Sequence, residues 1–231
     1  MIKIMSEIEK NLNIVRKRIE SACARCSRDN SSVKLVAVTK NVTTDQIAEA
    51  FKFGHRVFGE NYAQELRDKY KELSDLPIEW HFIGHLQKNK AKYVSPVAAL
   101  VETVDSTDLA DAISARATRI IDCLIEVNIS GETSKSGCPE TEIAKIAAHI
   151  EKIPNLNMRG LMTMPPYSDN PEISRPYFKK LRELLDRLNE EASSPEPYRE
   201  LSIGMSHDLE VAIEEGATIV RVGTAIFGER S

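Results

Sequence analysis

The protein has 231 residues, of which 42% are hydrophobic and 29% charged, and its formal net charge is -4. A chain of this length can bury a sizeable core, either as one large barrel or as two ordinary domains. Its basic residues are interspersed with acidic ones and no segment reaches the ~20 apolar residues of a membrane span, so we expect neither nucleic acid nor a membrane as a partner.

The N-terminal segment predicts an amphipathic helix over about residues 5–25, because four apolar residues recur there at helical spacing. They are Ile8, Leu12, Val15 and Ile19. The start of the chain has no apolar stretch long enough for a signal peptide, so we expect a cytoplasmic protein.

The next predicted element is a buried strand over residues 34–40, which is rich in valine and has no helical period. Side chains alternate along a strand, so Lys40 shares a face with Val36 and Val38. Lys40 either points into water past the end of the strand or is a Schiff-base lysine. Desolvation or a neighbouring cation can lower the pKa of a lysine from ~10.4 and leave the free amine that attacks an aldehyde. The rest of the chain decides between these alternatives.

Beyond this strand, helices and strands alternate. Thr43 and Gln46 have the spacing of a capping box for a helix that ends near Phe53, with Gly54 as its stop. Pro139 suits the first turn of a later helix. Further helices are predicted over about residues 63–73, after residue 89, and over 106–118, 139–150, 175–189 and 207–215. Strands are predicted over about residues 57–60, 79–83, 99–104, 122–127, 157–161, 200–203 and 219–222.

Eight strands separated by helices predict an α/β fold, a single (β/α)8 barrel that occupies residues 1–231 as one domain and begins with the N-terminal helix. That opening helix could supply the eighth outer helix. The competing interpretation is an open doubly wound sheet. Such a sheet rarely needs eight regular units, and the chain lacks a GxGxxG motif after its first strand.

The cysteines and histidines do not predict a metal or redox site. The four cysteines are expected to be free thiols, as is usual in a cytoplasmic protein. Cys23 and Cys26 form a CxxC pair, but it lies in a charged helical stretch and no second pair completes a zinc set. His81 and His85 are four residues apart, yet Gly84 and the strand-like segment before it break any shared helix face. We expect ordinary hydrogen-bonded histidines.

Two loops near the C-terminus have the composition of a phosphate site. In such a barrel the active site lies at the C-terminal ends of the strands, and the loops after strands seven and eight often hold phosphate. After the seventh predicted strand, Ser206 can act as the N-cap of a helix whose first amides bind an anion. After the eighth, Gly223 and Thr224 would let the backbone approach a phosphate closely. Both segments could equally be turns and caps, since Asp208 could satisfy the same helix unaided.

Arg221 interrupts an otherwise apolar strand, and a buried guanidinium needs an anionic partner. Three carboxylates near other strand ends could form a purely structural ion pair with it: Glu60, Asp105 and Glu126. A ligand phosphate would serve as well, because it accepts two parallel hydrogen bonds from an arginine.

Several segments carry motifs of high combined specificity. They are Val38-Thr39-Lys40, Phe58-Gly59-Glu60-Asn61-Tyr62 with Gln64-Glu65, Trp80-His81-Phe82-Ile83-Gly84 with Leu86-Gln87-Asn89-Lys90, Gly204-Met205-Ser206-His207-Asp208, and Val220-Arg221-Val222-Gly223-Thr224-Ala225-Ile226-Phe227-Gly228. Together they resemble the pyridoxal phosphate homeostasis protein family over nearly the whole chain from Lys34 onward. The resemblance implies a barrel like the N-terminal domain of alanine racemase, which holds pyridoxal 5′-phosphate as an internal aldimine.

The resemblance also implies roles for individual residues. Lys40 matches the family's cofactor-bearing lysine. The positions that match its phosphate-binding residues are Ser206, Gly223 and Thr224. Asn61 matches a residue beside the cofactor ring, and Arg221 matches an arginine near the cofactor whose contact stays open.

The chain departs from the family pattern just after Lys40. The family commonly continues with Thr, a second basic residue and Pro, where this chain has Asn41, Val42 and Thr43. The Schiff-base position is intact, but the departure argues against a role for a second lysine at this place in cofactor exchange.

Members of this family are regarded as vitamin B6 carriers or regulators that affect amino-acid and keto-acid balance, without an established catalytic reaction. We therefore expect a monomeric carrier that passes pyridoxal phosphate to apo-enzymes and has no catalytic residues. One alternative is a racemase-like enzyme, with Lys40 and a tyrosine such as Tyr167 as acid and base. In alanine racemases that tyrosine comes from a separate domain, for which we expect no room after the eighth strand. The other alternative is a class I aldolase-like barrel that uses the same amine on a sugar phosphate.

Overall fold

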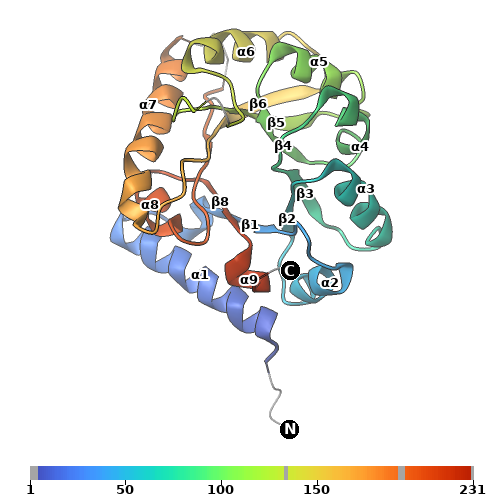
Figure 1. Ribbon diagram of the computed structural model, residues 1–231, viewed down its shortest axis with the longest axis vertical. Helices are drawn as coiled ribbons and strands as arrows, with labels where there is room; N and C mark the ends of the chain where they lie inside the picture. The colour runs from blue at the N-terminus through green and yellow to red at the C-terminus, as the bar shows by residue number, and fades with distance from the viewer. Residues whose placement is uncertain (1–4, 133–134, 192–195, 230–231) are drawn as a thin grey trace.

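The computed structural model describes residues 5–132, 135–191 and 196–229. Within these ranges eight parallel strands form a closed barrel surrounded by helices, as Figure 1 shows in a view along the barrel. The strands follow chain order around the barrel, and β8 pairs with β1 to close it. Their bounds are β1 Lys34–Val38, β2 Val57–Glu60, β3 Glu79–Phe82, β4 Leu100–Val104, β5 Ile121–Glu126, β6 Leu156–Met162, β7 Glu200–Ser202 and β8 Ile219–Val222. The predicted barrel is confirmed, and the open doubly wound sheet was wrong.

The helices alternate with the strands and lie outside them (Figure 1). Their bounds are α1 Glu7–Arg25, α2 Thr44–Lys52, α3 Ala63–Glu72, α4 Ala91–Val94, α5 Thr107–Ser114, α6 Ile143–Ile150, α7 Arg175–Glu191, α8 Leu209–Glu214 and α9 Thr224–Phe227. Short 3-10 segments cover Asn30–Ser32, Lys88–Lys90, Glu140–Glu142 and Pro171–Ser174. In the described part of the chain, no helix has both the length and the apolar character needed to cross a bilayer.

Helix α1 takes the place of an eighth outer helix, as predicted. After β8 the chain forms only the four-residue α9, which is too short to cover the neighbouring strands. Helix α1 packs against α8, α9 and α2 and so fills the gap between the last and the first helices of the ring (Figure 1). Its apolar stripe is buried, including Leu12 and Val15, which have no exposed surface.

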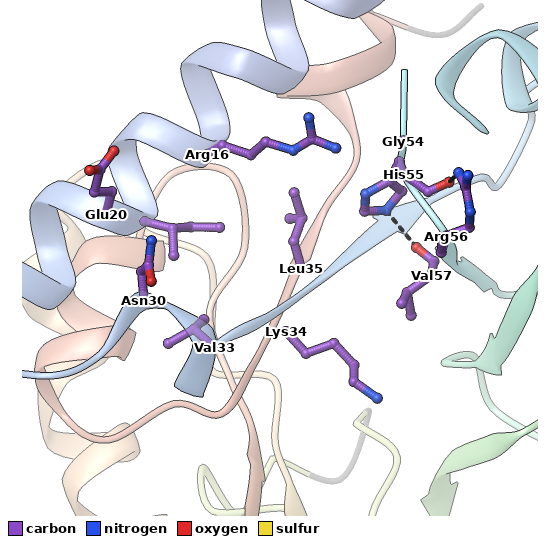
Figure 2. A pocket seen from close by; sticks show the side chains of 11 residues that line it. Arg16, Glu20, Asn30, Val33, Lys34, Leu35, Gly54, His55, Arg56 and Val57 are labelled. Carbon is purple, nitrogen blue, oxygen red and sulfur yellow. Dashed lines mark hydrogen bonds between the residues drawn. The ribbon is translucent and has the colours of Figure 1, made fainter. Parts of the chain in front are cut away.

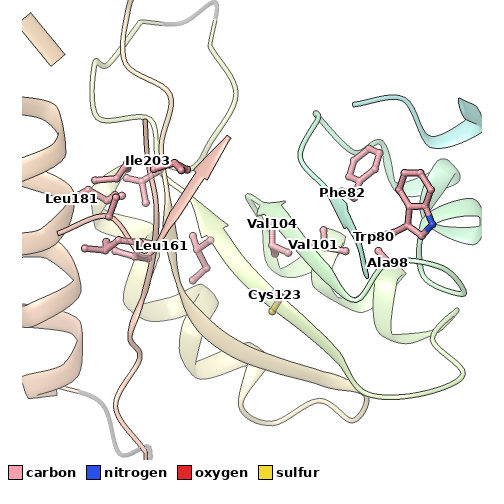
Figure 3. Packing of buried hydrophobic residues seen from close by; sticks show 14 of the residues in the cluster. Trp80, Phe82, Ala98, Val101, Val104, Cys123, Leu161, Leu181 and Ile203 are labelled. Carbon is pink, nitrogen blue, oxygen red and sulfur yellow. The ribbon is translucent and has the colours of Figure 1, made fainter. Parts of the chain in front are cut away.

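The core has an inner and an outer layer, because side chains alternate across each strand. The inner layer fills the barrel with Val36, Leu100, Leu124, Met162 and Ile219, against which Val57 packs. The outer layer lies between strands and helices. Figure 3 shows part of it, with Leu181 of α7 beside Leu161 and Ile203 and, across the barrel, Trp80 and Phe82.

Several predicted boundaries need correction. Strand β1 ends at Val38, so Lys40 lies in the following turn rather than in the strand. Pro139 precedes a 3-10 turn instead of opening an α-helix, and α5 ends at Ser114, short of the predicted residue 118. The capping box of Thr43 and Gln46 is confirmed, with hydrogen bonds in both directions.

The four cysteines are free thiols, and Cys23, Cys123 and Cys138 are buried. Burial raises the pKa of the Cys138 thiol to about 12, and it also raises the pKa of Cys23. Among the described residues, no group of three or more His, Cys, Asp or Glu side chains is placed to hold a metal ion.

Candidate functional site

A pocket of about 330 Å³ opens at the C-terminal ends of β1, β2, β7 and β8. Its lining residues are Val38, Lys40, Asn61, Tyr167, Met205, Ser206, His207, Arg221, Gly223 and Thr224. All six residues that the sequence singled out for cofactor binding are in this set, although their roles stay predictions. The volume of the pocket lies at the lower end of the range of about 300–1,000 Å³ for small-molecule sites.

The turn after β1 places Lys40 at the pocket. Lys40 is half-buried, and its Nζ lies 5.9 Å from the centre of the Tyr62 ring. The next residue, Asn41, has a φ of 56°, a left-handed conformation that asparagine adopts more readily than a β-branched residue. Val42 is buried and Thr43 caps α2, so the residues that depart from the family pattern have structural roles here.

The segment after β2 presents Asn61. Its backbone N–H donates to Glu60 Oε2 at 2.8 Å, which fixes the chain as it leaves the strand. A Cβ on Gly84 would lie 2.1 Å from the Asn61 carbonyl oxygen, so only glycine allows this close approach. The side-chain Oδ1 of Asn61 is buried and has no hydrogen-bond partner among the described residues. An unsatisfied buried acceptor beside a pocket is what a ligand donor would complete.

The loop after β7 forms a tight turn that brings Ser206 to the pocket. Gly204 has a φ of 89°, and the Met205 N–H donates to Asp208 Oδ1 at 2.7 Å. Helix α8 begins only at Leu209, so the prediction that Ser206 is its N-cap was wrong. The buried Asp208 carboxylate closes the turn instead and moves the start of the helix further along the chain.

Aromatic rings lie at one side of the pocket. The Tyr167 ring lies 4.8 Å from that of His207, so the loop after β6 contacts the loop after β7. Tyr167 is 71% exposed, and its hydroxyl donates to Asp169 Oδ1 at 3.0 Å. That hydrogen bond raises the pKa of the Tyr167 hydroxyl, which therefore stays protonated at neutral pH.

Arg221 of β8 is 3% exposed, and its side chain reaches Ser202 of β7 and Glu102 of β4. Its Nη2 donates to the Thr163 carbonyl at 3.1 Å, and its Nη1 donates to Ser202 Oγ. The same Nη1 lies 3.6 Å from Glu102 Oε2, and the Ser202 hydroxyl donates to that carboxylate oxygen at 2.5 Å. Glu102 is therefore the anion that compensates the guanidinium.

The three carboxylates predicted as partners of Arg221 do not form an ion pair with it. Glu60 binds Lys69 instead, at 2.6 Å, and Asp105 lies 3.9 Å from a histidine nitrogen. Glu126 is close enough for the charge of Arg221 to lower its pKa, but burial dominates and raises that pKa. Glu102 could have been found from the sequence by its position. It is a charged residue inside the apolar strand Leu100–Val104, just as Arg221 is inside its own strand.

The ion pair continues through the barrel as a row of alternating basic and acidic side chains. His81 Nδ1 lies 2.7 Å from Glu102 Oε1, and its Nε2 lies 3.1 Å from Glu79 Oε1, to which Lys34 also donates at 2.7 Å. Burial alone would lower the pKa of His81, but the hydrogen bonds to the two carboxylates outweigh it and raise that pKa. The hydrogen bond from His81, with that from Lys34, outweighs burial and lowers the pKa of Glu79 to about 2. His81 is thus a hydrogen-bonded core histidine, as expected.

Figure 2 shows a different pocket, of about 430 Å³, between α1 and the starts of β1 and β2 at the opposite end of the barrel. Two of its polar lining residues are bound to carbonyl groups of the chain itself. Arg56 donates to the Phe51 carbonyl at 2.7 Å, and His55 Nε2 donates to the Val57 carbonyl at 2.7 Å (Figure 2). Burial lowers the pKa of His55 to about 4, so the ring is neutral at physiological pH. The pocket at the C-terminal ends of the strands is therefore the stronger candidate.

Nearly the whole chain is similar to proteins of a known family. Residues 6–231 match the family described as "Alanine racemase, N-terminal domain". The chain is 47% identical over 224 residues to the pyridoxal phosphate homeostasis protein of Aquifex aeolicus, which covers 96% of this chain and 97% of that one. The human protein of the same name is 42% identical over 234 residues, covering 95% of this chain and 85% of its relative.

Among solved structures, PipY of Synechococcus elongatus with pyridoxal phosphate bound has a TM-score of 0.80 and 32% identity, covering 91% of this chain and 100% of PipY. An alanine racemase from Corynebacterium glutamicum has a TM-score of 0.69 and 16% identity, covering 97% of this chain and 61% of the racemase. At that identity the likeness to the racemase concerns the fold alone.

Proposed function

The chain belongs to the pyridoxal phosphate homeostasis protein family, and from this membership we propose that it holds pyridoxal 5′-phosphate covalently on Lys40 as an intracellular carrier or regulator of vitamin B6. The observation that carries the proposal is the convergence of an amine, a buried guanidinium and two hydroxyls in one pocket at the strand ends. The cofactor bound in PipY lends it further support.

The donor set fits the chemistry of the cofactor. Lys40 would hold the cofactor through its amine, because a lysine amine condenses with an aldehyde to a C=N bond and releases the oxygen as water. The hydroxyls of Ser206 and Thr224 and the backbone at Gly223 are suited to hold a phosphate group. The unsatisfied Oδ1 of Asn61 can accept a hydrogen bond from the ligand.

Arg221 retains donors for a ligand. The guanidinium carries five N–H donors, and Ser202 and Thr163 accept from two of its nitrogens within the described residues. The remaining donors can bind a phosphate or a ring nitrogen. Because Glu102 already compensates the charge, Arg221 holds its position before a ligand arrives.

A carrier role suits the pocket better than racemisation does. Bound pyridoxal phosphate supplies an electron sink, but racemisation also needs an acid and a base held on opposite faces of the substrate carbon. Tyr167 is the tyrosine that lines the pocket, and its hydroxyl is turned to Asp169 in a largely exposed loop. We therefore propose a non-catalytic protein that passes its cofactor to apo-enzymes. From the sequence we further propose that it is cytoplasmic and monomeric and has no nucleic-acid partner.

Solvent exchange separates a carrier from an enzyme. Cofactor-loaded protein is incubated with a panel of L-amino acids in deuterated water, and in parallel with an apo-enzyme that needs the cofactor. We expect the apo-enzyme to become active while α-deuteration stays below one equivalent per protein. Rapid α-deuteration over many turnovers would instead establish the racemase-like alternative. A protein that traps a sugar-phosphate fragment, and takes up no pyridoxal phosphate, would be the aldolase-like one.

A further inference from the structure

Lys69 of α3 is a buried lysine that sequence analysis did not identify. It is 8% exposed, although most lysines on outer helices extend into water. Its ammonium donates to the Thr39 carbonyl at 2.8 Å, to Glu60 Oε1 at 2.6 Å and to Glu65 Oε2 at 2.8 Å. All three of its N–H donors are therefore used.

These acceptors join the two segments that carry Lys40 and Asn61. The Thr39 carbonyl belongs to the peptide bond that leads into Lys40, and the Thr39 hydroxyl donates to Glu60 Oε1 at 2.9 Å. The other oxygen of Glu60 accepts from the Asn61 N–H at 2.8 Å. One ammonium thus sets the exit of the chain from β1 and, through Glu60, its exit from β2.

Glu65 extends the same network to the turn beyond Lys40. Its Oε2 accepts from Lys69 at 2.8 Å and from the Asn41 N–H at 3.4 Å. The backbone is therefore held on both sides of Lys40, at the Thr39 carbonyl and at the Asn41 amide. Since Glu60 has no exposed surface, water cannot take over the role of the ammonium.

We propose that Lys69 is a positioning residue that aims the Lys40 amine and the Asn61 side chain at the bound cofactor. The proposal rests on the proposed function, in which Lys40 carries that cofactor. Lys69 uses all three N–H donors and is absent from the pocket lining, so it acts through Thr39, Glu60 and Glu65.

The test compares rates of covalent attachment, followed by the visible absorption of protein-bound pyridoxal phosphate and by borohydride trapping. Lys69→Met removes the ammonium but leaves the Glu60 charge buried and unpaired, which can unfold the chain. The double variant Glu60→Gln with Lys69→Met removes both charges and so separates folding from positioning. Lys69→Arg keeps the charge with a different donor geometry. Lys71→Met, an exposed change on the same helix, is the matched control.

We expect attachment to slow on the order of ten- to a hundredfold in each Lys69 variant that folds, because a small misplacement of a reacting group has effects of that size. Lys71→Met should match the wild type. Attachment within about threefold of the wild-type rate in folded Lys69→Arg or in the folded double variant would overturn the proposal. Wild-type protein that never attaches the cofactor would refute the proposed function instead, which keeps the two failures distinct.

Discussion

Glu126 is a buried carboxyl close enough to Arg221 to sense its charge. It ends β5 with 4% of its surface exposed, and its Oε2 has no hydrogen-bond partner among the described residues. Burial raises its pKa to about 7, although the charge of Arg221 acts in the opposite direction. Near neutral pH this group therefore gains or loses a proton close to Arg221, and the protein's stability should follow its titration.

We predict that Glu126 makes the free energy of unfolding fall as pH rises. Its pKa is higher in the folded state than its usual 4.5, so the stability it contributes is present below that value and lost as pH rises to about 7. The loss should be about 3 kcal/mol. Urea unfolding of the cofactor-free protein between pH 4.5 and 8 measures it. In Glu126→Gln the decline should shrink by this amount, whereas the exposed Glu183→Gln should retain it. Identical pH profiles for wild type and Glu126→Gln would refute the assignment.

At the scale of elements, α1 does more than cover the barrel. Arg18 donates from Nε to Glu210 Oε1 at 2.6 Å and from Nη2 to Glu210 Oε2 at 2.8 Å. The same Nη2 donates to the Ser206 carbonyl at 2.9 Å. An N-terminal helix thus holds the loop after β7 that lines the pocket, and α1 should influence ligand binding without touching the ligand.

Removing this contact should weaken cofactor binding. We predict that Arg18→Met raises the dissociation constant of pyridoxal phosphate about fivefold, the equivalent of one hydrogen bond of about 1 kcal/mol. Arg25→Met is the matched control, because Arg25 lies on the same helix and pairs with Glu214 of α8 instead of with the loop. Titration of cofactor-free protein with pyridoxal phosphate at constant salt measures both. Equal affinities for the two variants would show that the contact from α1 is irrelevant to the site.

Elements with a strong local signal were predictable from the sequence. The valine-rich strand at residues 34–38 and the capped helix Thr44–Lys52 were located to within two residues, because their patterns are local. The start of α8 was misplaced, since a carboxylate three residues beyond Met205 closes a turn there. The partner roles of Glu102 and Lys69 were missed for a related reason. The pairing of Glu102 depends on Arg221, and that of Lys69 depends on Thr39 and Glu60. These partners come from other elements, so no local pattern reveals them.

At the scale of the whole molecule, closure of the barrel creates the candidate site. Strand β1 pairs with β8, with Val36 opposite Arg221, so residues from both ends of the chain meet at one rim. Lys40 follows the first strand and Thr224 follows the last, yet both line the same pocket. The sequence predicts that Lys40 and Thr224 lie close together only after the eight strand–helix units, and hence a closed barrel, have been recognised.

The most direct test of the central claim is to locate the attachment of the cofactor. Purified protein is loaded with pyridoxal phosphate, reduced with borohydride, digested and mapped by mass spectrometry, with Lys40→Arg treated in parallel. We predict a single reduced adduct on Lys40 in the wild type and neither visible absorption of a bound cofactor nor an adduct in Lys40→Arg. An adduct mainly on another lysine, or an undiminished adduct in Lys40→Arg, would contradict the account.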